Sequence, residues 1–216
     1  MFRKIDGSIS GSQIDDTSES TRNVWSGKKI QTVIDSALSG GSGGIQSGSK
    51  SELISLTGMS PGTQFYMIGD SEQKNKLWNW TGRTWQVHGE TVELKSGVSC
   101  IEGNTVEISG SGSTDDFEFK LTTSAEDVHV IGVVALQSVE MGEWASIACN
   151  GIWPVACDAQ SGQYDRANYL VCNSTDGLAN ESTSVSAQPF AKILENKTVS
   201  TDGDLVSAFL HTTEIY

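Results

Sequence analysis

The sequence predicts an all-β protein: an extended N-terminal arm and a short helix, a small aromatic β-meander, and then a C-terminal β-barrel or β-sandwich domain. Three observations lead to this fold class. The chain holds 23 Gly but only 3 Pro among 216 residues, with 37% apolar residues, which is typical of a turn-rich folded chain. Residues 115–121 alternate between polar and apolar side chains. Residues 128–157 contain short β-branched runs separated by turns.

Residues 128–157 are the stretch around which the other strands are expected to assemble. A β-branched run at 128–136 is followed by a turn at 141–143 and by an alternating segment at 144–149. Asn150-Gly151 then supplies the strongest short hairpin signal. We therefore expect a hairpin that returns along residues 152–157, and further strands must cover it because an isolated hairpin is marginally stable.

Residues 1–24 are predicted to form an extended anchoring arm. Ile5, Ile9 and Ile14 are isolated apolar residues among Gly, Ser, Asp and Thr, so the segment cannot build a core of its own. Such an arm is either disordered or a peptide that orders against another protein. The second interpretation is favoured, because single isoleucines suit a groove or a sheet edge. Together with Trp25 they are the candidate anchoring residues.

Residues 25–39 predict a short helix with Ser26 as the N-cap. One apolar stripe runs along it, consisting of Ile30, Val33, Ile34, Ala37 and Leu38. A helix of this length is marginal in water, so the stripe packs either on the globular part or on copies of itself. Ile and Val at the seam positions suit three strands, which makes Ile30, Val33, Ile34 and Leu38 the candidate trimerisation residues. Residues 40–49 are expected to be a flexible Gly/Ser linker.

Residues 12–34 carry a first resemblance. The segment contains Ile14-Asp15-Asp16, a Ser/Thr-rich spacer, and then Trp25-Ser26-Gly27-Lys28-Lys29-Ile30. It resembles a leader common in bacteriophage fibre proteins, which runs from Ile-x-Asp through such a spacer to Trp/Tyr-Ser-Ser-x-Lys-Ile and a short helix. Gly27 departs from that pattern, where Ser is usual. The resemblance implies a virion surface protein of either the head or the tail.

Residues 50–89 predict the aromatic meander, with strands at 63–68, 77–80 and 84–87. The run resembles a small aromatic meander found in phage fibre and appendage proteins. Its tryptophans have two interpretations. They either wedge a tiny sheet that has little aliphatic core, or they form a platform for carbohydrate or for nucleic-acid bases. On the second interpretation the candidate glycan contacts are Trp78, Trp80 and Trp85, with Asp70, Asn79 and Arg83 as polar partners.

Residues 90–216 are expected to form one β-domain. Residues 115–121 predict a strand with Phe117, Phe119 and Leu121 pointing inward. Further strands are expected at 168–172, 188–194 and 205–211, and the Ser/Thr/Asn-rich residues 173–186 are expected to be a solvent-facing loop.

The order of phrases in this C-terminal part carries a second resemblance. A Gly-Val-Val-Ala strand at 132–135, an acidic turn ending in Trp144, and the closing Ala191-Lys192-Ile193-Leu194-Glu195 resemble small β-domains of phage head-decoration proteins. Phe190 departs from the pattern, where small residues are common. The resemblance implies a protein that studs a capsid, usually as a trimer, and so it implies binding rather than turnover.

Charge and cysteine usage exclude several partners. The net charge is −13, with 27 acidic against 14 basic residues, which argues against nucleic acid and against anionic membranes as partners. Cys100, Cys149, Cys157 and Cys172 show no zinc-ligand spacing. Neither a secretion signal nor a membrane-spanning run is apparent, so we expect synthesis in the host cytoplasm and free buried thiols.

Catalysis is not predicted, and we expect no cofactor and no metal. His88, His129 and His211 fit no catalytic motif, and the acidic pairs Asp115/Asp116 and Glu140/Glu143 are of the kind usually solvated. The sequence therefore favours a phage virion structural protein, a capsid decoration or head-fibre subunit. The expected partners are copies of itself in a homotrimer and the major capsid protein or a tail protein, with host surface glycan as a further candidate. The alternatives are a tail-fibre or tail-adaptor subunit and a glycan-binding appendage tip.

Overall fold

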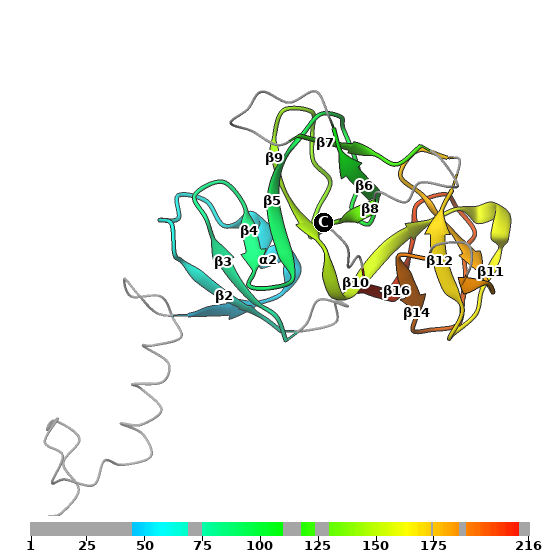
Figure 1. Cartoon of the computed structure of the whole chain (residues 1–216). Coiled ribbons are helices and arrows are strands. Elements are labelled where there is room, and N and C mark those ends of the chain that lie inside the picture. Colours follow the sequence, from blue (N-terminus) through cyan, green and yellow to red (C-terminus); the bar gives the residue numbers. More distant parts are fainter. Residues whose placement is uncertain are drawn as a thin grey trace, which may run out of the picture. The chain divides into compact units, whose positions relative to one another are not determined.

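The structure is a computed structural model that describes residues 45–68, 75–109, 118–123, 130–173, 175–185 and 189–211. Internal contacts divide the chain into two units, Met1–Gln46 and Ser47–Tyr216. The description below concerns the second unit, in which the described residues form an aromatic meander followed by two closed β-barrels (Figure 1). The all-β fold class predicted from the sequence is confirmed.

The meander is a four-stranded sheet in the order β1-β2-β3-β4, coloured blue to cyan-green in Figure 1. A short helix follows its first strand and is fixed by a capping box between Ser49 and Glu52. Across the sheet, Phe65 lies opposite Trp78, which lies opposite Val87, so that these buried side chains share one face. The elements are β1 (Gln46–Gly48), α2 (Lys50–Ser55), β2 (Gln64–Met67), β3 (Leu77–Trp80) and β4 (Trp85–Val87).

The beginning of the meander differs from the sequence prediction. Strand β1 lies within residues 40–49, which were expected to be linker, and helix α2 was not expected. The three expected strands are present as β2, β3 and β4. Three residues are too short a segment for a periodic pattern to reveal, and β1 is held by its neighbour: the Ile68 amide donates to the Gly48 carbonyl at 2.8 Å.

The first barrel closes in the order β5-β7-β6-β8-β9. Its core contains Val106, Phe119 and Ile147, each fully buried. Phe119 therefore points inward as predicted, Leu121 is half-buried, and Phe117 lies outside the described residues. The strands are β5 (Thr91–Ser96), β6 (Thr105–Ile108), β7 (Glu118–Leu121), β8 (Val130–Val134) and β9 (Trp144–Ala148).

The second barrel closes in the order β10-β13-β12-β14-β16, in yellow to red in Figure 1. Its longest pairing joins β10 and β16, which run antiparallel over eight residues each. The strands are β10 (Asn150–Cys157), β12 (Tyr169–Cys172), β13 (Ala179–Ser182), β14 (Ala191–Ile193) and β16 (Asp204–His211). Three short elements fall between these strands in the sequence. A 3₁₀ turn, η2 (Ala159–Ser161), and strand β11 (Gln163–Tyr164) follow β10, and β11 pairs with β15 (Lys197–Thr198), which precedes β16.

The predicted hairpin at Asn150-Gly151 is wrong. Strand β9 pairs with β5 and β8, whereas β10 pairs with β16 and β13, so the two consecutive strands belong to different barrels. Gly151 does adopt a positive φ of 90°, as the turn signal requires. The backbone amides of Cys149 and Asn150 donate to the Glu90 carbonyl at 2.8 and 3.4 Å, which holds this junction beside the end of the meander.

The C-terminal part differs from the expectation in two further ways. Residues 90–216 were expected to form one β-domain, and the described strands of that range close into two barrels. Residues 173–186 were expected to be a solvent-facing loop, but they contain β13, and Asn173, Leu178 and Ala179 are buried. The predicted strands at 168–172, 188–194 and 205–211 correspond to β12, β14 and β16.

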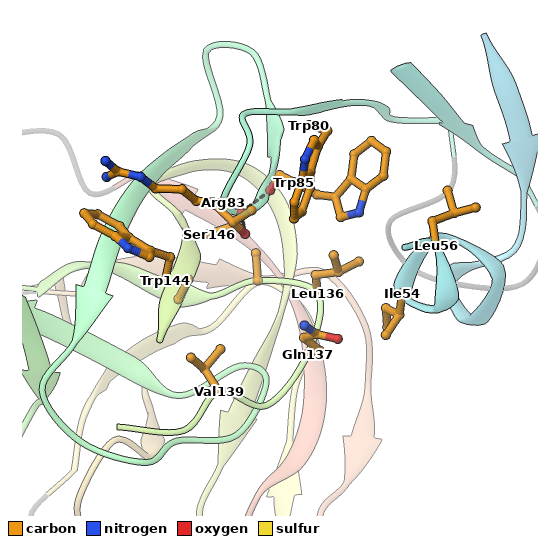
Figure 2. A pocket seen from close by; sticks show the side chains of 13 residues that line it. Ile54, Leu56, Trp80, Arg83, Trp85, Leu136, Gln137, Val139, Trp144 and Ser146 are labelled. Carbon is orange, nitrogen blue, oxygen red and sulfur yellow. Dashed lines mark hydrogen bonds between the residues drawn. The ribbon is translucent and has the colours of Figure 1, made fainter. Parts of the chain in front are cut away.

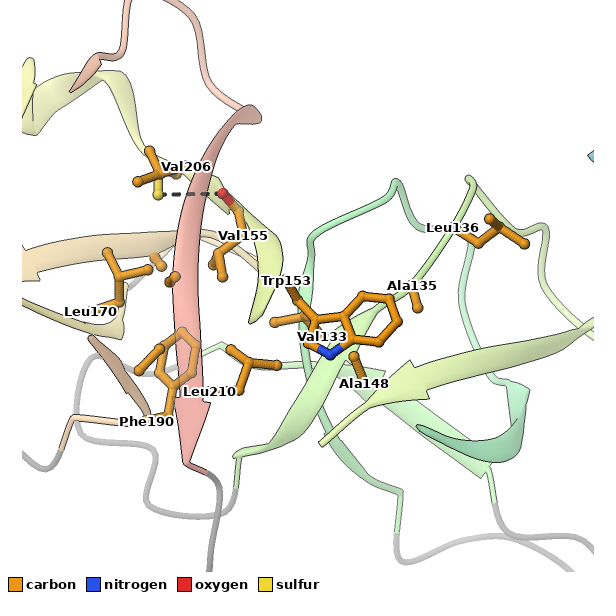
Figure 3. Packing of buried hydrophobic residues seen from close by; sticks show 14 of the residues in the cluster. Val133, Ala135, Leu136, Ala148, Trp153, Val155, Leu170, Phe190, Val206 and Leu210 are labelled. Atoms are coloured by element: carbon orange, nitrogen blue, oxygen red, sulfur yellow. Dashed lines mark hydrogen bonds between the residues drawn. The ribbon is translucent and has the colours of Figure 1, made fainter. Parts of the chain in front are cut away.

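One continuous cluster of buried side chains joins the meander to both barrels. Figure 3 shows Trp153 of β10 at its centre, with Val133, Ala135 and Ala148 of the first barrel on one side and Leu210 of the second on the other. The same cluster includes Trp78 of β3. A backbone hydrogen bond reinforces the link between the two barrels: the Ala156 amide donates to the Gly103 carbonyl at 2.9 Å.

The four cysteines are free thiols, and three of them are buried. Burial raises the pKa of Cys149 to about 11 and that of Cys157 to about 12, because a thiolate would lose its hydration there. These two thiols therefore stay protonated at neutral pH, where the neutral form is a poor nucleophile.

Candidate functional site

The candidate residues of the arm and the predicted helix lie outside the described residues. These are the anchoring residues Ile5, Ile9, Ile14 and Trp25 and the trimerisation residues Ile30, Val33, Ile34 and Leu38. Asp70, Asp115, Asp116 and His129 also lie outside them. The anchoring and trimerisation assignments therefore stay predictions.

The three meander tryptophans are placed differently from one another. Trp78 is fully buried and Trp85 is 4% exposed, whereas Trp80 is half-buried. Trp85 packs tilted against Trp80, with ring centroids 5.4 Å apart, and edge-on against Phe65 at 6.3 Å. A fully buried ring offers no face to a sugar, so Trp78 acts as a wedge of the small sheet, and Trp80 is the most exposed of the three.

Trp80 and Trp85 form one wall of a cavity of about 130 Å³ (Figure 2). The other walls come from the end of helix α2, from the segment that connects β8 to β9, and from β9 itself. In Figure 2, Trp80 and Trp85 stand on one side, Leu136 and Gln137 face them, and Ile54 and Leu56 of the α2 region lie beside them. We call this space the tryptophan cavity.

Arg83 and Trp144 form a pair at the edge of the tryptophan cavity. The guanidinium carbon lies 4.2 Å from the centre of the Trp144 ring, a distance suited to a cation–π contact. One Arg83 nitrogen also lies 3.6 Å from a Glu93 carboxylate oxygen, so its charge is balanced nearby. Two contacts therefore hold the guanidinium beside Trp144 and Glu93, although the side chain is 55% exposed.

A second, more open hollow of about 560 Å³ lies beside the junction of the meander and the second barrel. Its apolar part comes from Ile152 and Phe209, which face each other across β10 and β16 and are 46% and 44% exposed. Lys76 and Glu90 form an ion pair at its rim. The hollow has an apolar floor, but nothing in the described residues covers it.

Catalytic and metal-binding groups were sought over the same residues. Among the described residues no group of three or more His, Cys, Asp and Glu side chains could hold a metal ion. Glu143 accepts a hydrogen bond from the Glu140 amide at 3.1 Å, and Ser99 donates to Glu140 at 2.6 Å, so both carboxylates serve the turn before β9. Within the described part of the chain no helix is long and apolar enough to span a membrane.

Most of the cavity's lining residues were not candidate site residues in the sequence analysis, among them Leu136, Gln137 and Trp144. These three lie more than 50 positions after Trp80 in sequence, and only barrel closure brings them to it. One signal was present for Trp144, which ends the acidic turn at 142–144. Its partner Arg83 was named as a polar neighbour of the aromatic run.

Comparison with known proteins gives a limited match. No family model matches the chain, and no curated protein matches it. Among solved structures, the chain is similar to the head fiber gp8.5 N base of bacteriophage phi29, with 15% sequence identity and a TM-score of 0.42. The matched region covers 58% of this chain and 97% of that one.

Proposed function

We propose that the chain is a structural subunit of a tailed-bacteriophage virion, a capsid decoration or head-fibre subunit that forms a homotrimer. Its N-terminal arm docks on the shell, where the major capsid protein is the partner, and its β part projects outward. The observation that carries the proposal is that one chain contains both a phage-fibre-like leader, at residues 12–34, and a compact all-β unit that begins at residue 47.

The architecture of the β unit suits a protein displayed in many copies. A closed barrel leaves no long unpaired strand edge, and such edges are sites of aggregation between neighbouring copies. The net charge of −13 adds repulsion between projecting units. Protonated, mostly buried thiols leave little for oxidants outside the cell to attack.

The arm supplies the attachment in this proposal. Ile5, Ile9 and Ile14 insert into a groove or sheet edge of the shell, and Trp25 adds a larger apolar contact before the helix. Ile30, Val33, Ile34 and Leu38 bring three chains together, so that three arms bind at once and the assembly gains avidity.

The experiment that tests the proposal is labelling of the chain's C-terminal end on intact virions, followed by electron microscopy. The expected result is a regular lattice of label over the head. Label confined to the tail would replace the proposal with the tail-fibre or tail-adaptor alternative, and label absent from virions would reject the virion role.

A further inference from the structure

We infer that the tryptophan cavity is a binding site for one neutral sugar residue of a surface glycan. This inference goes beyond the proposed function and does not depend on it, because a sugar site on the β unit would serve a head fibre or a tail part equally. It also moves the candidate glycan contact from the three meander tryptophans to a cavity that two of them, Trp80 and Trp85, line.

The size of the cavity sets the scale of the ligand. A volume of about 130 Å³ is smaller than the ~300 Å³ or more of pockets that enclose a whole small-molecule ligand. It accommodates one ring-sized group, partly immersed. The occupant is therefore one unit of a larger molecule or a weakly held monosaccharide.

The walls combine aromatic rings with hydrogen-bonding groups. A pyranose presents a flat face of C–H groups and a rim of hydroxyls, so it needs an aromatic surface flanked by planar polar side chains. Trp80 supplies the half-buried ring, and Gln137, which is exposed, supplies an amide that both donates and accepts. Arg83 also lines the cavity, with its guanidinium over the Trp144 ring.

Part of the cavity wall is held in place by internal hydrogen bonds before any ligand arrives. The β3–β4 turn is locked because Thr81 Oγ1 accepts from the amides of Arg83 and Thr84 at 3.2 and 3.1 Å. Thr84 and Ser146, which both line the cavity, share a hydroxyl hydrogen bond of 3.1 Å. Such preorganisation lowers the entropy that binding must overcome.

The wall opposite Trp80 contains a strained residue. Leu136 has a φ of 74°, which is rare for a branched side chain, and the Gln137 amide donates to the Ala135 carbonyl at 2.9 Å across it. Backbone strain of this kind persists where the surrounding structure enforces it and gathers at binding sites. Here the tight turn places Gln137 next to Leu136 on the wall opposite Trp80, as Figure 2 shows.

Charge selects a neutral sugar. The Arg83 guanidinium already has a carboxylate partner in Glu93 at 3.6 Å and lies over the Trp144 ring. The chain as a whole carries −13, so an acidic sugar meets repulsion without an unpaired cation to offset it.

The test is a titration of the full-length chain with simple glycosides, followed by the indole N–H signals in ¹⁵N-labelled protein. The probes are the methyl glycosides of glucose, galactose, N-acetylglucosamine and N-acetylgalactosamine, with methyl glucuronide as the charged comparison. Trp80→Phe and Trp144→Phe assign the two relevant signals among the six tryptophans. We expect at least one neutral glycoside to shift both signals saturably in the millimolar range while the buried Trp78 and Trp153 signals stay in place.

Two matched variants make the result specific. Gln137→Ala removes the amide at the cavity and should weaken binding about fivefold, the effect of one lost hydrogen bond. Gln86→Ala removes an amide from β4 outside the cavity lining and should leave binding unchanged. The inference is overturned if no neutral glycoside shifts the Trp80 and Trp144 signals, if the glucuronide binds more tightly, or if both variants bind alike.

Discussion

The ring of Trp153 meets the ring of Trp78 edge to face, with centroids 5.7 Å apart and planes at 86°. Trp153 belongs to the second barrel and Trp78 to the meander, so this contact joins elements that are far apart in the sequence. Lys76 extends the arrangement, with its ammonium 4.2 Å from the centre of the Trp153 ring. Trp153 Nε1 also donates to the Asn150 carbonyl at 2.7 Å, which fixes the orientation of the ring.

Trp153→Ala should lower the free energy of unfolding by about 3–5 kcal/mol, because it empties the centre of the cluster that joins the meander to both barrels. Urea denaturation measures the loss. Phe209→Ala on the neighbouring strand β16 is the control, since that side chain is 44% exposed and should cost far less. Equal losses for the two variants would contradict the joining role of Trp153.

Gly103→Ala should destabilise the chain more than Gly142→Ala. Both glycines have a positive φ, 83° and 89°, so both substitutions carry a similar backbone strain of about 1 kcal/mol or more. A Cβ at Gly103 would also lie 2.6 Å from the Ala156 nitrogen, whereas one at Gly142 would have no heavy atom within 4 Å. Thermal or urea unfolding of the two variants isolates the contact between barrels, and equal destabilisation would show that this contact is loose.

The free energy of unfolding should fall at alkaline pH because the buried Cys157 thiol resists deprotonation in the folded chain. Its pKa is raised from 9.0 to about 12 by burial, so the unfolded chain loses this proton first. The free energy of unfolding is therefore retained below pH 9.0 and declines as the pH rises toward the folded-state value. Urea midpoints at about pH 8 and about pH 10.5 measure the decline, and Cys157→Ala should show a smaller one. Identical declines would assign the effect to other groups.

Ile30→Asp combined with Ile34→Asp should convert trimers to monomers, because two charges per chain would enter the predicted apolar seam. Sedimentation velocity distinguishes the two states. Gln31→Asp combined with Thr32→Asp adds the same charge to the predicted polar face and should leave the trimer intact. Trimers in the first variant would refute the trimerisation assignment.

The strands were predicted where local pattern determines them. Phe119 was placed inward from simple alternation, and β3 and β4 were found from the Trp80 to Trp85 turn. The failures lie where closure of a barrel overrides a local signal. Asn150-Gly151 has the composition of a hairpin turn, but β10 pairs along its whole length with β16 and does not fold back on β9.

The candidate site was predicted only in part for a related reason. Trp80 and Arg83 belong to one turn and could be read together from adjacent positions. Leu136, Gln137 and Trp144 come from the first barrel, and no local pattern reveals that β8 and β9 bring them opposite Trp80. The positive φ of Leu136 is equally invisible, since leucine is not a residue that signals such a turn.

Binding of the full-length chain to virions that lack it tests the central claim most directly, because the claim is that the arm attaches and the β unit projects. The measurement is co-sedimentation of the wild type and of a variant with Ile5→Asp, Ile9→Asp and Ile14→Asp. The account predicts that the wild type sediments with the heads, while the variant stays in solution as a folded trimer. A variant that binds the heads as well as the wild type would contradict it.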